Sequence, residues 1–211
     1  MHQLALLALE FFTVFIAIPL LIYYRRIPNH PIPFLLVGAT AAFFLLKHDP
    51  TFDSPRLFAW GNTRAVLIPI LLRDFVCLLL LGLTVRFLAP DLLFSLVKKA
   101  PALWALVMLL YPLLSVYPQE LLYRAFFFQR YAPLLGSGWG MLLASALAFG
   151  FVHIIFRNTL AVFLCALGGL LFALTYYRSG SLLLACLEHA LFGNFLFTIG
   201  LGQFFYHRAR L

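Results

Sequence analysis

The ionisable residues that lie inside, or at the margins of, long apolar runs include Glu120, Arg124, His153, Glu188 and His189. An ionised side chain at the centre of a membrane helix costs roughly 2.5–3.5 kcal/mol on insertion scales. Such groups therefore need polar partners or a water-filled cavity. Both conditions are typical of functional sites in membrane proteins.

These residue types could hydrolyse a substrate with an activated water. A carboxylate and an imidazole can hold and deprotonate a water, and a second imidazole with an amide can stabilise a developing oxyanion. A zinc site made by Glu120, His153 and His189 is the alternative, with one position left for water. The sequence has no HExxH motif to support that metal site, and no serine or cysteine stands in a comparably clear nucleophile motif.

The spacing of the polar groups predicts that they gather from three helices. Glu120 and Arg124 are four residues apart, which places them on one helix face at ion-pairing distance. Such a pair could also serve only to make both charges tolerable in lipid. His153 lies in a second apolar run, and Glu188 and His189 lie in the last one. Because lipid does not solvate these groups, we expect them to converge in the interior of the bundle.

The composition predicts a membrane protein. Of the 211 residues, 64% are hydrophobic and 10% are charged, whereas a soluble domain carries about 25% charged residues. We expect an all-α, polytopic bundle of about six to eight transmembrane helices, forming a single domain over residues 1–211 in the lipid bilayer. The net charge of +8 comes mostly from basic residues between apolar runs. It therefore indicates topology signals and argues against nucleic-acid binding.

Apolar runs close to the 20 residues of a membrane span define the expected elements. Helices over about 1–100 precede a core over about 101–205. Proline removes a backbone donor, so we expect a break near Pro118. The polar stretch 47–64 is expected to form a loop outside the membrane, and the basic end 207–210 to be solvated. The expected spans are 4–24, 31–46, 65–88, one that starts near 102, 139–156, 159–177 and 181–205.

Three short motifs in this order resemble the CAAX protease and bacteriocin-processing (CPBP, or abortive-infection) family of intramembrane endopeptidases. The family pattern is EExxxR, then FxxxH, then HxxxN or HxxxD, on separate membrane helices. Arg124, Phe149 with His153, and His189 match it. The resemblance covers residues from about 101 to the end of the chain, and the segments PQELLYRAF and LEHALFGN look like those of a bacterial subgroup.

Two positions depart from the family pattern. The first glutamate of EExxxR is Gln119 here, which cannot accept a proton, so Glu120 would have to take the role of the base. Asn194 follows His189 by five residues, about 140° away on a regular helix, whereas Gly193 is about 40° away. A π-bulge or unwinding near Gly193 would restore the face. Alternatively, Glu188 supplies the extra polar group.

The resemblance implies an intramembrane endopeptidase that cleaves a peptide bond of a membrane-associated protein. Glu120 and His153 would activate the water, and His189 with Asn194 would stabilise the oxyanion. Arg124 would fix Glu120 and keep it ionised. The implied chemistry is glutamate-dependent and needs no cofactor, with zinc as the alternative, and the implied location is the bacterial inner membrane.

Two other functions are compatible with the sequence. Gln119 motivates a catalytically inactive membrane partner of the same fold, such as an immunity or scaffold protein. The charged residues Glu10, Arg73, Asp74 and Glu188 motivate a small transporter or channel that uses them as a proton or ion path.

Overall fold

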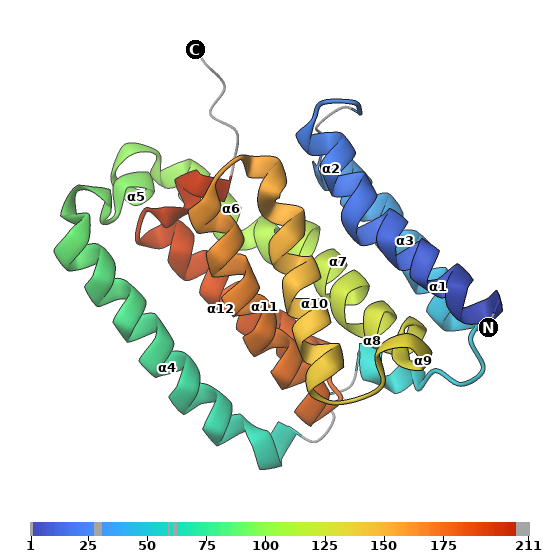
Figure 1. The fold of residues 1–211 in the computed structure, drawn as a ribbon. Helices are drawn as coiled ribbons and strands as arrows, with labels where there is room; N and C mark the ends of the chain where they lie inside the picture. The colour runs from blue at the N-terminus through green and yellow to red at the C-terminus, as the bar shows by residue number, and fades with distance from the viewer. Residues whose placement is uncertain (1, 28–30, 59, 61–62, 206–211) are drawn as a thin grey trace.

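The computed structural model describes residues 2–27, 31–58, 60 and 63–205, and all regular elements among them are helical (Figure 1). The expected all-α class is therefore confirmed. Six helices in this part of the chain are long and apolar enough to cross a membrane, and Leu182–Thr198 is a shorter apolar helix. The predicted number of six to eight spans agrees with them. The basic end 207–210 lies outside the described residues.

The N-terminal half forms three of these spans. The first joins α1, a π-helical turn η1 and α2 without interruption. In Figure 1, α1 to α3 lie along one edge of the molecule and α4 along the opposite edge, with α10 to α12 between them. The elements are α1 (His2–Phe12), η1 (Thr13–Ala17), α2 (Ile18–Tyr23), α3 (Pro31–His48), η2 (Ser54–Leu57), α4 (Thr63–Leu88), η3 (Pro90–Leu92) and α5 (Ser95–Lys99).

A single 30-residue helix, Pro101–Arg130, carries the first predicted motif, and the expected break near Pro118 is wrong. Two π-helical turns flank the proline instead. A π turn is wider than an α turn, so it accommodates the missing N–H and the proline ring while the helix continues. The segments are α6 (Pro101–Tyr111), η4 (Pro112–Val116), α7 (Tyr117–Glu120), η5 (Leu121–Phe126) and α8 (Phe127–Arg130).

The last helices pack in the middle of the bundle. After α9 (Ala132–Leu135) come α10 (Trp139–Val152), η6 (His153–Phe156), α11 (Thr159–Ser179), α12 (Leu182–Thr198) and η7 (Leu201–Phe205). Asn158 and Ser181 cap α11 and α12, because their side chains accept from the backbone N–H groups three residues later. Gly180, at φ 67°, makes the left-handed turn that ends α11.

Small residues let α10 and α11 approach closely. A Cβ atom placed on Gly150 would lie 2.7 Å from the Cβ of Ala166, and one placed on Gly169 would lie 3.3 Å from the Cα of Ala146. Ala146 and Gly150 are one turn apart on the same face of α10. Membrane helices associate through such small-residue contacts, because lipid provides no hydrophobic driving force between them.

Polar contacts at the ends of the spans fix the loop after α3. Asp49 accepts hydrogen bonds from Thr51 and from the side-chain amide of Gln129 on α8, at 2.9 Å. The hydrogen bond from the Thr51 hydroxyl, followed by that from Gln129, lowers the pKa of the Asp49 carboxyl. On the N-terminal span, Glu10 accepts from the Arg130 guanidinium and from the Tyr131 hydroxyl.

Candidate active site

The centre of the candidate site is a buried carboxylate–imidazole contact between α7 and α12. The Nδ1 atom of His189 lies 2.8 Å from Oε1 of Glu120. Glu120 has no exposed surface and His189 is 5% exposed. An ionised carboxylate can only accept a hydrogen bond, so His189 carries a proton on Nδ1 and donates a hydrogen bond from it to Glu120. The sequence predicted that these two residues, 69 positions apart, would meet, and the structure brings them together.

One ring face and the second nitrogen, Nε2, of His189 also have contacts in the structure. Its ring stacks on Phe172 of α11, with ring centres 4.5 Å apart and planes inclined by 14°. Its Nε2 atom lies 3.0 Å from the hydroxyl of Tyr111, the last residue of α6. With the proton on Nδ1, Nε2 accepts from the Tyr111 O–H. The site therefore contains a Glu120–His189–Tyr111 chain, and Tyr111 is a member that the sequence motifs do not identify.

Arg124 is completely buried beside Glu120. Its Nε atom lies 3.1 Å from Oε2 of Glu120, but the N–H does not point along the line between them, so the contact is an ion pair without a hydrogen bond. The Nη1 atom donates to the Ser145 hydroxyl and to the Tyr123 carbonyl, each at 3.2 Å. The guanidinium also lies over the ring of Phe149, 4.9 Å from its centre. These contacts fix the predicted i,i+4 pair.

Several buried polar atoms of the Glu120–Arg124 ion pair make no hydrogen bond. Oε2 of Glu120 and both Nε and Nη2 of Arg124 are buried without a hydrogen-bond partner. Buried polar atoms of native proteins are normally satisfied by protein groups or by water. A water molecule or a substrate group at this position would therefore find one acceptor, Oε2, and two donors, Nε and Nη2, that make no other hydrogen bond.

His153 lies near the pair but does not bind it. Its Nδ1 atom is 2.7 Å from the Phe149 carbonyl oxygen, to which it donates, so Nε2 carries the lone pair in the neutral ring. The His153 ring centre is 5.0 Å from that of Phe149, and the same Phe149 ring is 5.4 Å from the ring centre of His189. The two imidazoles thus contact one phenylalanine, and His153 makes no direct hydrogen bond to Glu120 or His189.

Gln119 and Asn194 lie outside the Glu120–His189–Tyr111 chain. The Gln119 amide donates to the Ser115 hydroxyl on its own helix, at 2.6 Å. The Asn194 amide donates to the Met108 carbonyl, at 3.4 Å. Of the two alternatives that the sequence leaves open, the π-bulge or unwinding near Gly193 does not occur, because α12 is a regular α-helix through this position. Its regular course turns Asn194 away from the face that carries His189.

Glu188 belongs to a separate polar network between α4 and α12. It accepts from the Arg73 guanidinium, which also binds Asp74 at 2.9 Å and the Thr175 hydroxyl at 3.1 Å. This network shares no residue with the contacts of Glu10, which binds Arg130 and Tyr131. The carboxylates that motivated an ion path thus lie in two ion-paired networks rather than along one path.

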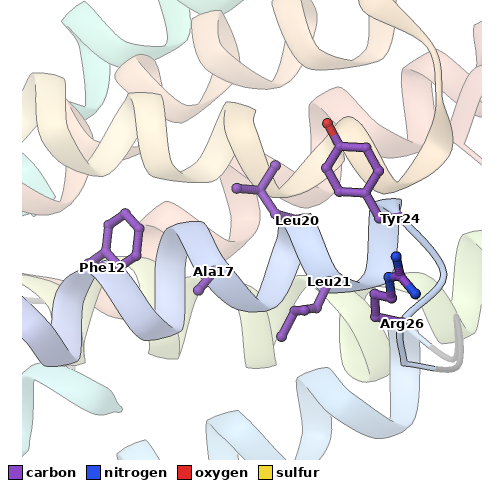
Figure 2. A pocket seen from close by; sticks show the side chains of 6 residues that line it. All are labelled: Phe12, Ala17, Leu20, Leu21, Tyr24 and Arg26. Atoms are coloured by element: carbon purple, nitrogen blue, oxygen red, sulfur yellow. The ribbon is translucent and has the colours of Figure 1, made fainter.

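Two surface cavities lie away from Glu120, His153 and His189. The first, of about 520 Å³, is a groove beside α1 and α2, where Phe12, Leu21, Tyr24 and Arg26 are among its lining residues (Figure 2). The second, of about 390 Å³, lies between α4 and α11. Neither includes Glu120, His153 or His189 in its lining. All three of these side chains are buried, so the site is a buried cluster.

The candidate ligand residues do not form a metal site within the part of the chain that the structure describes. No three His, Cys, Asp or Glu side chains there lie close enough to hold a metal ion. In particular, Glu120 and His189 bind each other, and His153 donates to a backbone carbonyl. The residues of the alternative zinc site thus do not fit that ion in this arrangement.

Membrane-spanning helices around a buried carboxylate, imidazole and guanidinium define a polytopic membrane protein with a candidate hydrolytic site. Residues 101–195 match the family model described as type II CAAX prenyl endopeptidase Rce1-like. This match confirms the resemblance to the CPBP proteases that was inferred from the motifs. The matched segment includes Tyr111 and all the predicted site residues. No curated protein and no solved structure in the comparisons matches the chain.

Proposed function

We propose that this protein is an intramembrane endopeptidase that hydrolyses peptide bonds of membrane-associated proteins with a water activated at Glu120. The observation that carries the proposal is the fully buried contact between Glu120 and His189, two residues from separate motifs, with the charge of Arg124 beside it. The match of residues 101–195 to the Rce1-like family model supports the protease class.

In the proposed reaction, Oε1 of Glu120 is held by His189 Nδ1, so Oε2 is the oxygen that takes a proton from water. The hydroxide oxygen bonds to the carbonyl carbon of the scissile amide. When the C–N bond breaks, Glu120 returns the proton to the leaving nitrogen, which leaves an acid and an amine. Arg124 balances the carboxylate charge, and His153 offers its free Nε2 as a second acceptor for the water.

This scheme differs from the sequence-based expectation in two roles. His189 orients the base, and Asn194 does not stabilise the oxyanion, because its amide binds the Met108 carbonyl. We also propose that the reaction needs no metal, since Glu120 and His189 direct their donor atoms at each other.

The resemblance of two segments to a bacterial subgroup supports the bacterial inner membrane as the location of the protein.

The test is cleavage of a membrane-anchored reporter by the purified protein in liposomes. Glu120→Gln and His189→Ala should each lower turnover by about 100-fold or more, because a positioned general base contributes about 10²–10⁴-fold and His189 holds that base in position. Glu10→Gln is the matched control, since it changes a carboxylate in another apolar helix. Treatment with a metal chelator should leave turnover unchanged. Full turnover in both site variants would reject the proposal.

A further inference from the structure

Tyr111 has a polar contact that packing does not require. Its hydroxyl lies 3.0 Å from His189 Nε2, across the interface between α6 and α12. Its ring meets His189 edge-on, with centres 6.0 Å apart, and meets Phe197 at 5.4 Å. The aromatic contacts place the ring, and the hydroxyl then points at the imidazole nitrogen that Glu120 leaves free.

Gly193 makes the room for this contact. A Cβ atom at position 193 would lie within 2.6 Å of the Cζ atom of Tyr111, so any side chain there would displace the ring. Position 193 follows His189 by four residues, which places it on the same face of α12. The tyrosine from α6 thus occupies the place that a side chain of α12 would otherwise fill.

A hydroxyl suits both protonation states of His189. When Nε2 carries the lone pair, the Tyr111 O–H donates to it. When the ring is protonated, Nε2–H donates to the phenolic oxygen, and no heavy atom needs to move. With Glu120 on Nδ1 and Phe172 against the ring face, both nitrogens and one ring face are then held.

We propose that Tyr111 is a positioning residue of the hydrolytic site. It acts through His189: its hydroxyl fixes the ring orientation that keeps Nδ1–H on Oε1 of Glu120, so that Oε2 remains the oxygen that receives the proton. Hydrogen-bond partners of this kind hold the ring of a functional histidine in a fixed orientation. This inference rests on the proposed function.

The experiment compares Tyr111→Phe with the wild type in the liposome assay. Phenylalanine keeps the ring against Gly193 and Phe197 and removes only the hydroxyl. We expect kcat to fall by about 10- to 100-fold with KM almost unchanged. We also expect the 15N resonance of His189 Nε2 to shift. Tyr117→Phe is the matched control, because it removes a tyrosine hydroxyl from the same helix without touching His189.

A double variant tests whether the side chains at positions 111 and 193 compete for the same space beside His189. Tyr111→Ala should lose more activity than Tyr111→Phe, and Tyr111→Ala with Gly193→Asn should recover part of it, because an amide on the His189 face can bind Nε2 in the vacated space. Gly193→Asn alone should be impaired by the clash with Tyr111.

The outcomes separate this inference from the proposed function. A wild-type protein that cuts the reporter, together with a Tyr111→Phe variant of equal kcat and unchanged Nε2 resonance, overturns the role of Tyr111 and leaves hydrolysis standing. A wild-type protein that cuts no membrane-anchored reporter overturns the proposed function and, with it, the positioning role.

Discussion

Three buried polar groups form the centre of the candidate site: the Glu120 carboxylate, the Arg124 guanidinium and the His189 imidazole. Aromatic rings surround them, since Arg124 lies over Phe149 and the ring of Phe172 stacks on His189. In such a low-dielectric environment each electrostatic contact is stronger than in water. The planar guanidinium also suits contact with an aromatic face, so a lysine would not replace Arg124.

A variant of Gln119 tests whether position 119 or position 120 supplies the catalytic base. Its amide binds Ser115, whereas the Glu120 carboxylate reaches His189. We therefore expect Gln119→Ala to retain turnover close to that of the wild type in the reporter assay, in contrast to the loss of about 100-fold or more in Glu120→Gln.

The comparison uses Ser115→Ala as its control, because that change removes the partner of Gln119 and leaves Glu120 untouched. If Gln119→Ala lost as much turnover as Glu120→Gln, the assignment of the base to Glu120 would be wrong.

At the scale of helices, the π turn η4 explains how Tyr111 joins Glu120 at one site. The two residues are nine positions apart, so a regular α-helix would place them about 180° apart, on opposite faces. The wider turn at Pro112–Val116 lies between them and changes the face that each presents. This is why the spacing in the sequence gave no sign of Tyr111.

Close packing of α10 on α11 supports the helices that carry Phe149 and Phe172. Gly150→Leu should destabilise the protein strongly, since even a Cβ atom at this position would lie 2.7 Å from that of Ala166 and 3.0 Å from backbone atoms of the same residue. We expect a clearly lower melting temperature in detergent, because overpacking costs about 1–3 kcal/mol or more.

Gly140→Leu offers no clean control, because Gly140 also lies close to backbone. Leu143→Met does, since Leu143 is an exposed residue of the same helix. An unchanged melting temperature in Gly150→Leu would contradict the close approach of α10 and α11.

The helices and the Glu120–Arg124 pair were predictable because hydropathy and i,i+4 spacing are local signals. The convergence of Glu120 with His189 was also predictable, since buried charges in lipid need partners. The continuous helix through Pro118 and the contact of Tyr111 were not predictable, because each depends on the tertiary packing of distant segments.

For the whole molecule, Arg73 attaches the peripheral helix α4 to the central helices. It binds Asp74 on its own helix, Thr175 on α11 and Glu188 on α12, and both carboxylates are almost fully buried. Arg73→Ala would leave two buried carboxylates without their cation. Removing one partner of a buried ion pair costs about 3–5 kcal/mol, so we expect a large loss of thermal stability in detergent.

Arg178→Ala is the control for that variant, because Arg178 is an exposed arginine that lines the same cavity between α4 and α11. Adding Asp74→Asn and Glu188→Gln to Arg73→Ala should restore much of the stability, since the uncompensated charges are then removed. Equal melting temperatures for Arg73→Ala and the wild type would show that α4 does not depend on this network.

The two helices that hold Glu120 and His189 differ greatly in length. Pro101–Arg130 has 30 residues, about 45 Å at 1.5 Å per residue, whereas Leu182–Thr198 has 17, about 25 Å. Against a hydrocarbon thickness of about 30 Å, the first is too long and the second too short. Hydrophobic mismatch therefore acts on them in opposite senses: the long helix tilts more in a thin bilayer, and the short one draws the lipid inward in a thick one. The acyl-chain length of the surrounding lipid thus bears directly on how well the carboxylate and the imidazole remain in register.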